Sequence, residues 1–491
     1  MADDLRRHPH LYEINAWPWL DAVSRREGRA LTLGAVPDRE WDQLAERGID
    51  LVYLMGLWRR SALGRQIARS DPQLFGAYDE AVPGWRARDV VGSAYCISGH
   101  EPDPRIGTWN DLATVRAKLS ARGMRLIVDF ISNHTAFDHP WVGQFPDRYV
   151  QGDDAAFRRQ PSAFRAIERS TGEVQFLACG RDPFFPPWTD VAQLDYFNDE
   201  TRAAMIDVWK MLASHADGVR CDMAMLALTD VFRSTWSPLV SGPAPAHEFW
   251  ADARAAAPDF VMIAEVYWDL EWRLQQLGFD FTYDKRLYDR LLHARPADVR
   301  DHLRAEPGYQ CHSVRFIENH DEPRSATAFG DRLRAAAVVM STLPGLRFFH
   351  DGQFEGRRAR LPVQLGILPH EAADSGLVEF YRRLLSIVDA PVFHDGECQL
   401  REIGACDDTS PALVAWQWRL GDDERIVVVN LGSGVAHGHV RLAGVASSTD
   451  AITFEDLLDG HRYPWPRTEI QARGLYVRLD TGGAHVFRVV D

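Results

Sequence analysis

The chain has little of what marks a nucleic-acid-binding protein. Its only lysines are Lys118, Lys210 and Lys285, and its formal net charge is −15 at pH 7. Nucleic-acid recognition depends on clustered lysine and arginine side chains that neutralise phosphates. The composition therefore argues against a nucleic-acid partner.

Signals for secretion, disulfides and membrane insertion are also missing. The six cysteines form no C-x-x-C pair and no Cys/His cluster at metal-ligand spacing, which favours free thiols in a reducing compartment. Residues 1–8 lack the apolar stretch of a secretory signal, and no later segment approaches the ~20 apolar residues of a membrane span. We expect a cytoplasmic protein with no membrane partner.

Short apolar runs separated by helical patterns recur up to about residue 390. Eight of these runs read as buried strands: residues 11–14, 51–55, 126–130, 219–221, 261–264, 279–282, 314–317 and 346–349. Alternation of buried strands with helices is typical of an α/β fold with a parallel sheet. Eight repeats predict a (β/α)8 TIM barrel.

Two helices show the local signals clearly. Thr108 and Asp111 have the spacing of a capping box, and Gly123 can end the helix that follows. Asn198 is placed to cap a second helix, whose apolar residues recur at helical spacing. Between His134 and this cap lies a segment rich in Pro, aromatic and charged residues, which predicts a small subdomain inserted after the third strand.

Beyond about residue 390 the apolar period changes from helical to alternating. Val414, Trp416, Trp418 and Leu420 alternate with other residues, which predicts strands of an antiparallel β-sandwich. The expected domains are the barrel at 1–134 and 195–390, the inserted subdomain at 135–194, and the C-terminal β-sandwich at 391–491.

Three acidic residues, Asp222, Glu265 and Asp321, each follow an apolar run. Carboxylates at the ends of parallel barrel strands usually serve catalysis, although any one alone is more often a helix cap or a partner of arginine. Their flanking segments, in chain order after DFISNH at 129–134, are GVRCD at 218–222, IAE at 263–265 and FIENHD at 316–321. This set resembles the alpha-amylase superfamily of glycoside hydrolases, nearest to alpha-glucosidase-like members.

The resemblance implies a role for each acid. Asp222 occupies the nucleophile position, Glu265 the acid/base position, and Asp321 the position that grips sugar hydroxyls. A nucleophile and an acid/base residue paired in this way would retain the anomeric configuration through a covalent glycosyl-enzyme. Arg220, two residues before Asp222, should lie on the same side of the strand and keep Asp222 ionised, whereas Glu265 needs a raised pKa.

Further residues match substrate-binding positions of the family. His134 and His320 correspond to histidines that hydrogen-bond the innermost sugar, and Tyr95 to a tyrosine that stacks on it. Asp129 matches a mainly structural acid. Arg324, in the run HDEPR, resembles members that take short substrates from the non-reducing end. The plainer alternative for the histidines and Tyr95 is ordinary core packing.

Departures from the family pattern bear on metals and specificity. Met225 and Leu226 replace a Lys-His pair that amylases use in substrate and metal contacts, and Cys96 stands where Asp is common. A calcium site remains conceivable from Asn133 with Asp153, Asp154, Asp182 and Asp190, but solvated loop charges are the simpler interpretation. We expect no metal and no cofactor.

The sequence thus predicts a retaining α-glycoside hydrolase acting on oligosaccharides or small α-glucosides. Two alternatives stay open. The same acids serve a transglycosylase or a sugar isomerase, because the acceptor that reaches the glycosyl-enzyme decides the product. A non-catalytic carbohydrate-binding or partner module is the alternative from another class. The oligomeric state stays open.

Overall fold

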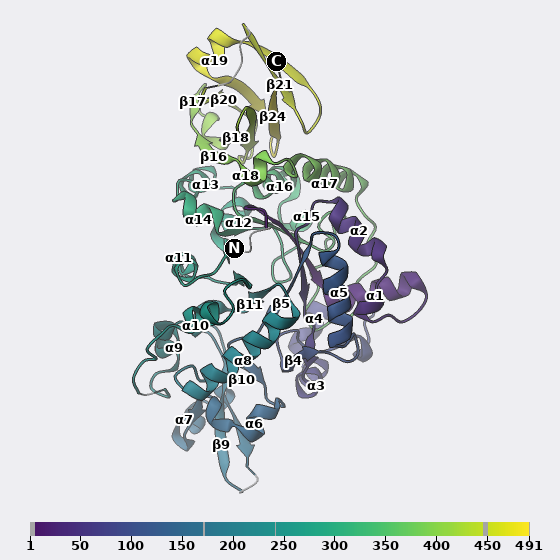
Figure 1. Cartoon of the computed structure of the whole chain (residues 1–491), viewed down its shortest axis with the longest axis vertical. Coiled ribbons are helices and arrows are strands. Elements are labelled where there is room, and N and C mark those ends of the chain that lie inside the picture. The colour runs from purple at the N-terminus through teal and green to yellow at the C-terminus, as the bar shows by residue number, and fades with distance from the viewer. Residues whose placement is uncertain (1–4, 170–171, 241, 445–449, 491) are drawn as a thin grey trace.

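The structure, a computed structural model of the chain, describes residues 5–169, 172–240, 242–444 and 450–490. Residues 1–4, which begin the segment considered above for a secretory signal, lie outside the described residues. Figure 1 shows three parts along the long axis of the molecule: C-terminal strands at one end, a barrel in the middle and an inserted group of strands at the other end. We propose that these parts are the domains bounded above.

The middle part is a closed barrel of eight parallel strands, so the predicted TIM barrel is confirmed. In chain order the strands are β1 (His10–Asn15), β2 (Leu51–Met55), β5 (Arg125–Phe130), β11 (Gly218–Cys221), β12 (Val261–Ala264), β13 (Phe281–Tyr283), β14 (Ser313–Arg315) and β15 (Leu346–His350). Pairing of β1 with both β2 and β15 closes the cylinder. Nearly every strand residue is buried, because helices cover the outside and side chains fill the inside.

Two predicted strands are displaced. The apolar run at 279–282 becomes β13 only from Phe281, and the run at 314–317 leaves the ladder after Arg315. Phe316 and Ile317 are nevertheless buried. Apolar character therefore continues past the paired backbone, because the chain still faces the core where it leaves the sheet.

Helices cover the barrel as the local signals predict. Of the two helices whose caps the sequence indicates, α5 (Trp109–Ser120) begins with the capping box of Thr108 and Asp111. The other, α8 (Asp199–His215), begins with the side chain of Asn198 accepting a backbone N–H. Other long helices around the barrel are α1 (Ala16–Glu27), α2 (Asp38–Glu46), α10 (Phe249–Ala256), α12 (Lys285–Leu292), α16 (Leu333–Thr342) and α17 (Ser375–Val388).

An antiparallel sheet is inserted after β5, the third barrel strand. Its strands are β6 (His134–Ala136), β7 (Gln151–Gly152), β8 (Phe164–Glu168), β9 (Val174–Gly180) and β10 (Trp188–Gln193). The first and last of these strands in the chain, β6 and β10, pair with each other, so the chain leaves and re-enters the barrel at neighbouring points. The inserted sheet thus stands beside the carboxyl end of β5.

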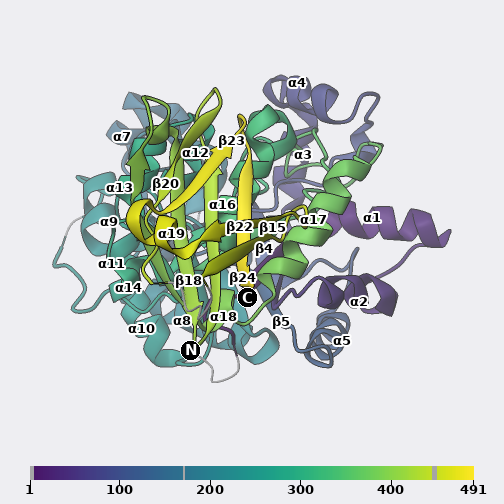
Figure 2. The ribbon, with the colours of Figure 1, turned by 90° about the horizontal axis from the view of Figure 1, so that it is seen from above.

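The C-terminal part holds two antiparallel sheets, one of six strands and one of three. In β18 (Leu413–Leu420) both faces are buried except at the last two residues, whereas the sequence suggests one buried face. The indoles of Trp416 and Trp418 point to the barrel and both donate to the Thr342 carbonyl of α16, at 3.2 and 2.7 Å. Ala415 packs with the second sheet, so β18 lies between two layers, and Figure 2 shows the C-terminal strands lying over the barrel helices.

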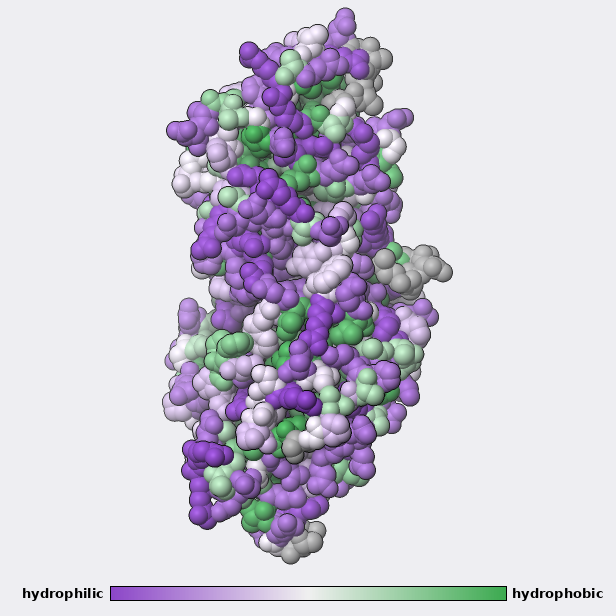
Figure 3. All heavy atoms as spheres, turned by 90° about the vertical axis from the view of Figure 1, so that its left-hand side faces the viewer, coloured by the Kyte–Doolittle hydropathy of each residue, from purple (hydrophilic) through white to green (hydrophobic). Residues whose placement is uncertain are grey.

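The described helices include none long and apolar enough to cross a membrane. On the face in Figure 3, hydrophobic residues gather in small separate patches among hydrophilic ones.

Candidate active site

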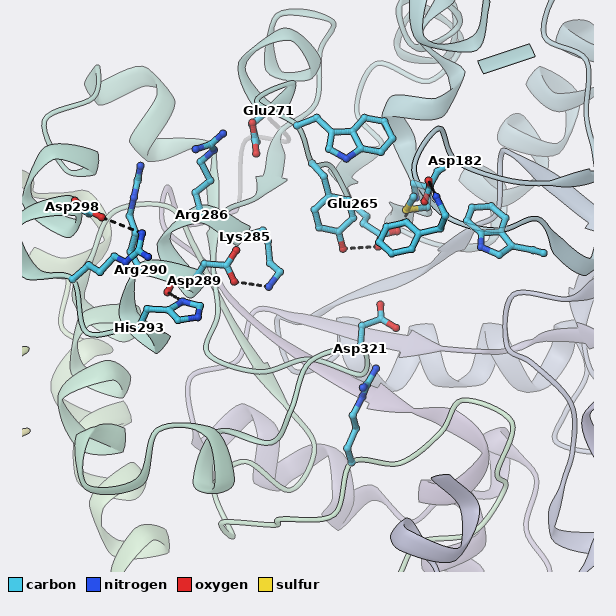
Figure 4. A pocket seen from close by; sticks show the side chains of 17 residues that line it. Asp182, Glu265, Glu271, Lys285, Arg286, Asp289, Arg290, His293, Asp298 and Asp321 are labelled. Atoms are coloured by element: carbon cyan, nitrogen blue, oxygen red, sulfur yellow. Dashed lines mark hydrogen bonds and ion pairs between the residues drawn. The ribbon is translucent and has the colours of Figure 1, made fainter. Parts of the chain in front are cut away.

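The three predicted acids lie at the carboxyl end of the barrel. Asp222 directly follows β11, Glu265 directly follows β12, and Asp321 lies six residues beyond β14. All three line a cavity of about 450 Å³. In Figure 4, Glu265 and Asp321 point into the open space from different sides. Parallel strands end at the same rim, which is why residues far apart in the chain converge.

Arg220 joins two of these acids. Its side chain is only 1% exposed, and its guanidinium contacts Asp222 Oδ1 at 2.7 Å and Glu265 Oε2 at 2.8 Å. The sequence predicts the first contact from the alternation of strand side chains, but not the second. A planar fork of donors suits two carboxylates at once. The two carboxylates are therefore held next to each other by one buried cation.

The environment of Glu265 favours its protonated form. Burial, opposed by Arg220 and helped by the negative charges of Asp222 and Asp321, raises the pKa of Glu265 to about 7. The carboxyl also accepts the backbone N–H of Met223 at 2.7 Å and the hydroxyl of Tyr267 at 2.9 Å. Burial also raises the pKa of Asp222, against which the charge and hydrogen bond of Arg220 act. Glu265 can thus hold a proton near neutral pH.

Asp321 is kept ionised by a different partner. Its side chain is 44% exposed within the cavity, and Oδ2 lies 2.9 Å from His320 Nε2. Burial opposes ionisation, but the charge of His320 lowers the pKa of Asp321 well below its usual range. Likewise burial opposes the charge of His320, whereas Asp321 and the wholly buried Glu13 raise its pKa. Glu13 accepts from the backbone N–H of His320 at 3.2 Å and also pairs with the ring Nδ1.

The remaining walls of the inner cavity include Tyr95 and His134. The hydroxyl of Tyr95 lies 2.6 Å from His320 Nε2, and the Arg220 guanidinium stands 5.3 Å from its ring centroid. His134 Nε2 lies 3.1 Å from the Tyr95 carbonyl oxygen. Burial lowers the pKa of His134 to about 4, so its ring is neutral at pH 7.

Four predicted site residues, Asp129, Arg220, His320 and Arg324, are not among the described residues that line the two cavities. Arg220 and His320 contact the acids directly, whereas Asp129 and Arg324 have other partners. Asp129 Oδ2 accepts the Gly56 N–H at 2.7 Å and its other oxygen pairs with Tyr53. Arg324 contacts Glu318 at 2.6 Å. Both side chains are directed into the protein and hold backbone near the site.

A second, larger cavity continues from the first. It measures about 1100 Å³ and shares Trp188, Met223, Glu265 and Asp321 with the inner one. Figure 4 shows its far wall formed by charged residues from α12 and the turn after it. Glu265 and Asp321 therefore lie at the junction of an inner and an outer chamber, whereas Asp222 lines the inner chamber.

Two of the residues considered for calcium are engaged with other protein groups. Asn133 Oδ1 accepts from Gln193 at 3.0 Å, and Asp153 caps a helix by accepting the Ala156 N–H at 2.7 Å. Within the described residues, no group of three or more His, Cys, Asp or Glu side chains is arranged to hold a metal ion.

Sequence reasoning missed two contributors. Glu13 is an ionisable residue inside the apolar strand β1, and a charge at a buried position needs a partner, which is the signal that could have identified it. The second contributor is Tyr267, two residues after Glu265 in the chain. Its hydrogen bond to that acid depends on side-chain direction, which spacing alone does not give.

Comparisons with known proteins agree with this geometry. Residues 94–361 match the family model described as alpha amylase, catalytic domain. Alpha-amylase MalA of Haloarcula japonica is 25% identical over 366 residues, covering 72% of this chain and 49% of that protein. Alpha-amylase 3 of Dictyoglomus thermophilum is 21% identical over 285 residues, covering 53% and 52%. The chain thus spans about half the length of these curated relatives.

Solved structures show the same fold along the whole chain. The noncanonic maltogenic alpha-amylase AmyB from Thermotoga neapolitana superposes with a TM-score of 0.69 at 19% identity, over 99% of both chains. An alpha-amylase from Lactobacillus plantarum gives a TM-score of 0.67 at 18% identity, again over 99% of both. The family model covers more than half of the chain, and its matched segment contains Asp222, Glu265 and Asp321. The chain therefore belongs to the alpha-amylase superfamily of glycoside hydrolases.

Proposed function

We propose that this chain is a retaining α-glycoside hydrolase that cleaves α-glucosidic bonds of oligosaccharides or small α-glucosides. The observation that carries the proposal is the bridge from Arg220 to both Asp222 and Glu265, at 2.7 and 2.8 Å. Retaining enzymes hold their two carboxyl groups about 5 to 5.5 Å apart, without room for a water between them. Two carboxylates bound to one guanidinium suit that spacing.

In the first step Glu265 donates its proton to the glycosidic oxygen while Asp222 attacks the anomeric carbon. The bond from that carbon to the leaving oxygen breaks, the leaving group departs as an alcohol, and an ester to Asp222 forms. Arg220 favours the ionised Asp222 that this attack needs. The raised pKa of Glu265, about 7, supplies the proton.

In the second step a water attacks the anomeric carbon, Glu265 takes its proton, and Asp222 leaves as carboxylate. The switch of Glu265 from acid to base follows from the same charges. The negative charge of Asp222 is one cause of the raised pKa of Glu265. Forming the ester removes that charge, so the pKa of Glu265 falls when a base is required.

The inner chamber then holds the sugar whose bond is cleaved. Asp321, ionised beside His320, accepts hydrogen bonds from sugar hydroxyls, while Tyr95 and His134 line the same chamber. We assign Asp129 and Arg324 the task of positioning these groups through the backbone that they hold.

The test uses an external nucleophile to trap each half of the reaction. An Asp222→Ala variant with an activated α-glucoside and azide should form the β-glucosyl azide, because azide takes the place of the missing carboxylate. A Glu265→Ala variant should give the α-glucosyl azide through the ester. Asp230→Ala, an exposed acid of α9 (Thr229–Trp236), serves as control and should form neither azide. The same anomer from both variants would refute the assignment.

Transfer to a sugar acceptor is the second candidate. The outer chamber of about 1100 Å³ opens directly onto Glu265 and offers room for an acceptor in place of water. Proton NMR of products from maltose and maltooligosaccharides measures the partition. Larger products at early times favour transfer, whereas α-glucose released from the start favours hydrolysis.

A further inference from the structure

The helix α12 turns its polar face toward the outer chamber. Leu287, Tyr288 and Leu291 are buried in the core, as expected for the apolar face of a surface helix. The opposite face, however, lines the cavity with Lys285, Arg286, Asp289, Arg290 and His293. Figure 4 shows these side chains along one wall, across from Asp182. A face that usually meets bulk water here belongs to the substrate cleft.

This wall is rich in cations, and some lack a carboxylate partner. Lys285 lies between Asp289 at 2.7 Å and Glu322 at 3.0 Å, and Arg286 pairs with Asp269. Arg290 has as its side-chain partner the ring of His302, and no acid of the described residues pairs with it.

One further cation of the chamber, Arg360, comes from outside α12. It is exposed and lines the outer chamber together with Asp321 and Glu265. Its side chain makes no hydrogen bond or ion pair with any described residue. Burial raises the pKa of Asp321, and the charge of His320 lowers it. The positive charge of Arg360 contributes a smaller lowering. Arg360 is thus an uncommitted guanidinium beside the acids, on the side where a leaving group departs.

We propose that the outer chamber recognises an anionic group, a carboxylate or a phosphate monoester, on the leaving-group side of the glycosidic bond, with Arg360 as its ligand. The proposal rests on the proposed function and names its substrate class. Arg290, which pairs with no acid of the described residues, adds positive potential to the same chamber.

Two physical arguments favour an anion over a neutral sugar. The guanidinium plane presents paired donors that match two oxygens of a carboxylate or phosphate, a geometry that single sugar hydroxyls do not use fully. In addition, the protein carries a net charge of −15, which repels anions at long range. Arg290 and Arg360, which pair with no acid of the described residues, oppose that repulsion locally in the chamber that they line.

The test compares two α-glucosides that differ by one charge. 4-Carboxyphenyl α-glucoside carries an anion on its leaving group, and its methyl ester is the neutral counterpart. The ester is the more electron-withdrawing group, so intrinsic reactivity favours the ester. A higher kcat/KM for the acid must then come from binding. We expect a preference of about tenfold for the acid, the size of one charge-assisted contact at a partly exposed site.

Arg360→Gln should bring the ratio of the two kcat/KM values to about one, and Arg360→Lys should restore part of it. The matched control is Arg358→Gln, because Arg358 lies two residues away, is exposed, and donates to the Ala326 carbonyl instead of lining the chamber. This control should keep the wild-type ratio. Equal turnover of acid and ester in the wild type, or a preference that survives Arg360→Gln, would overturn the proposal.

A second pair distinguishes the two anions: maltose, and maltose with a phosphate on its reducing-end glucose. Calorimetric binding of all four compounds to the Asp222→Asn variant separates this proposal from the proposed function. Tighter binding of the charged compounds that depends on Arg360, without turnover by the wild type, would refute the hydrolase and keep the anion site. Turnover with no charge preference would do the reverse.

Discussion

Replacing Glu265 with glutamine should make the protein more stable at pH 8 while removing its proposed acid. Burial, with the negative charges of Asp222 and Asp321, raises the pKa of Glu265 from 4.5 to about 7. A carboxyl whose pKa is raised by folding binds its proton more tightly in the folded state. The free energy of unfolding therefore falls as pH rises from 4.5 to about 7. That interval corresponds to about 3 kcal/mol.

The glutamine of the variant fits the same contacts. Its amide oxygen can accept from Arg220 and from the Met223 N–H, as Glu265 Oε2 does at 2.8 and 2.7 Å. Its amide nitrogen faces the Tyr267 hydroxyl, which can rotate to accept. The substitution therefore removes a charge and creates neither a cavity nor an unpaired donor.

Scanning calorimetry at pH 5, 6, 7 and 8 measures the effect. The melting temperature of Glu265→Gln should exceed that of the wild type by an amount that grows from pH 5 to 7 and then levels. Glu80→Gln, at an exposed glutamate of α4 (Pro72–Ala81), controls for the loss of a surface charge and should give a difference without that slope. A Glu265→Gln variant less stable than the wild type at pH 8, or a difference independent of pH, would refute the reasoning.

Two further predictions concern the hydrogen bond of Tyr267 to Glu265 and the buried charge of Glu318. Tyr267→Phe removes the 2.9 Å hydrogen bond from the tyrosine hydroxyl to Glu265, and that bond favours the ionised acid. The alkaline limb of the kcat/KM profile should therefore move up by about one pH unit. Tyr149→Phe, which removes a hydroxyl bonded to Thr135, is the control, and a downward move of the limb in Tyr267→Phe would contradict the prediction. Despite burial, Arg324 and its neighbours lower the pKa of Glu318 to about 2, so its stabilising effect is present above pH 4.5 and lost as pH falls toward 2. Urea unfolding of Glu318→Gln should show a loss of about 3 to 5 kcal/mol at pH 7 that shrinks at pH 3, whereas equal loss at both would exclude this cause.

Much of the architecture could be predicted because its causes are local. The barrel strands are short apolar runs, and the starts of α5 and α8 follow from caps within three residues of each helix. The placement of the three acids follows from one rule, that parallel strands end at the same rim. Their proposed roles come from the resemblance and stay predictions.

The side-chain contacts that could not be predicted join segments that are distant in the sequence. The alternation of side chains along a strand predicts Arg220 beside Asp222, but it does not predict the contact of Arg220 with Glu265 after the next strand. Arg324 pairs with the buried Glu318, a contact that the sequence does not indicate, and its substrate-binding role stays a prediction. The polar face of α12 reads as an ordinary solvated face, and only the packing of the barrel turns it into a wall of the cleft. Side-chain partners of this kind are set by tertiary structure.

The hydrogen bonds between Glu13 and His320 join residues 307 positions apart. Glu13 comes from the first barrel strand, while His320 follows the seventh, and the eighth strand must pair with the first before the cylinder closes. Without β15 the barrel cannot close, so Glu13 and His320 are not brought together and His320 is not held toward Asp321. The site therefore requires the complete barrel, and a fragment that ends before β15 should lack it.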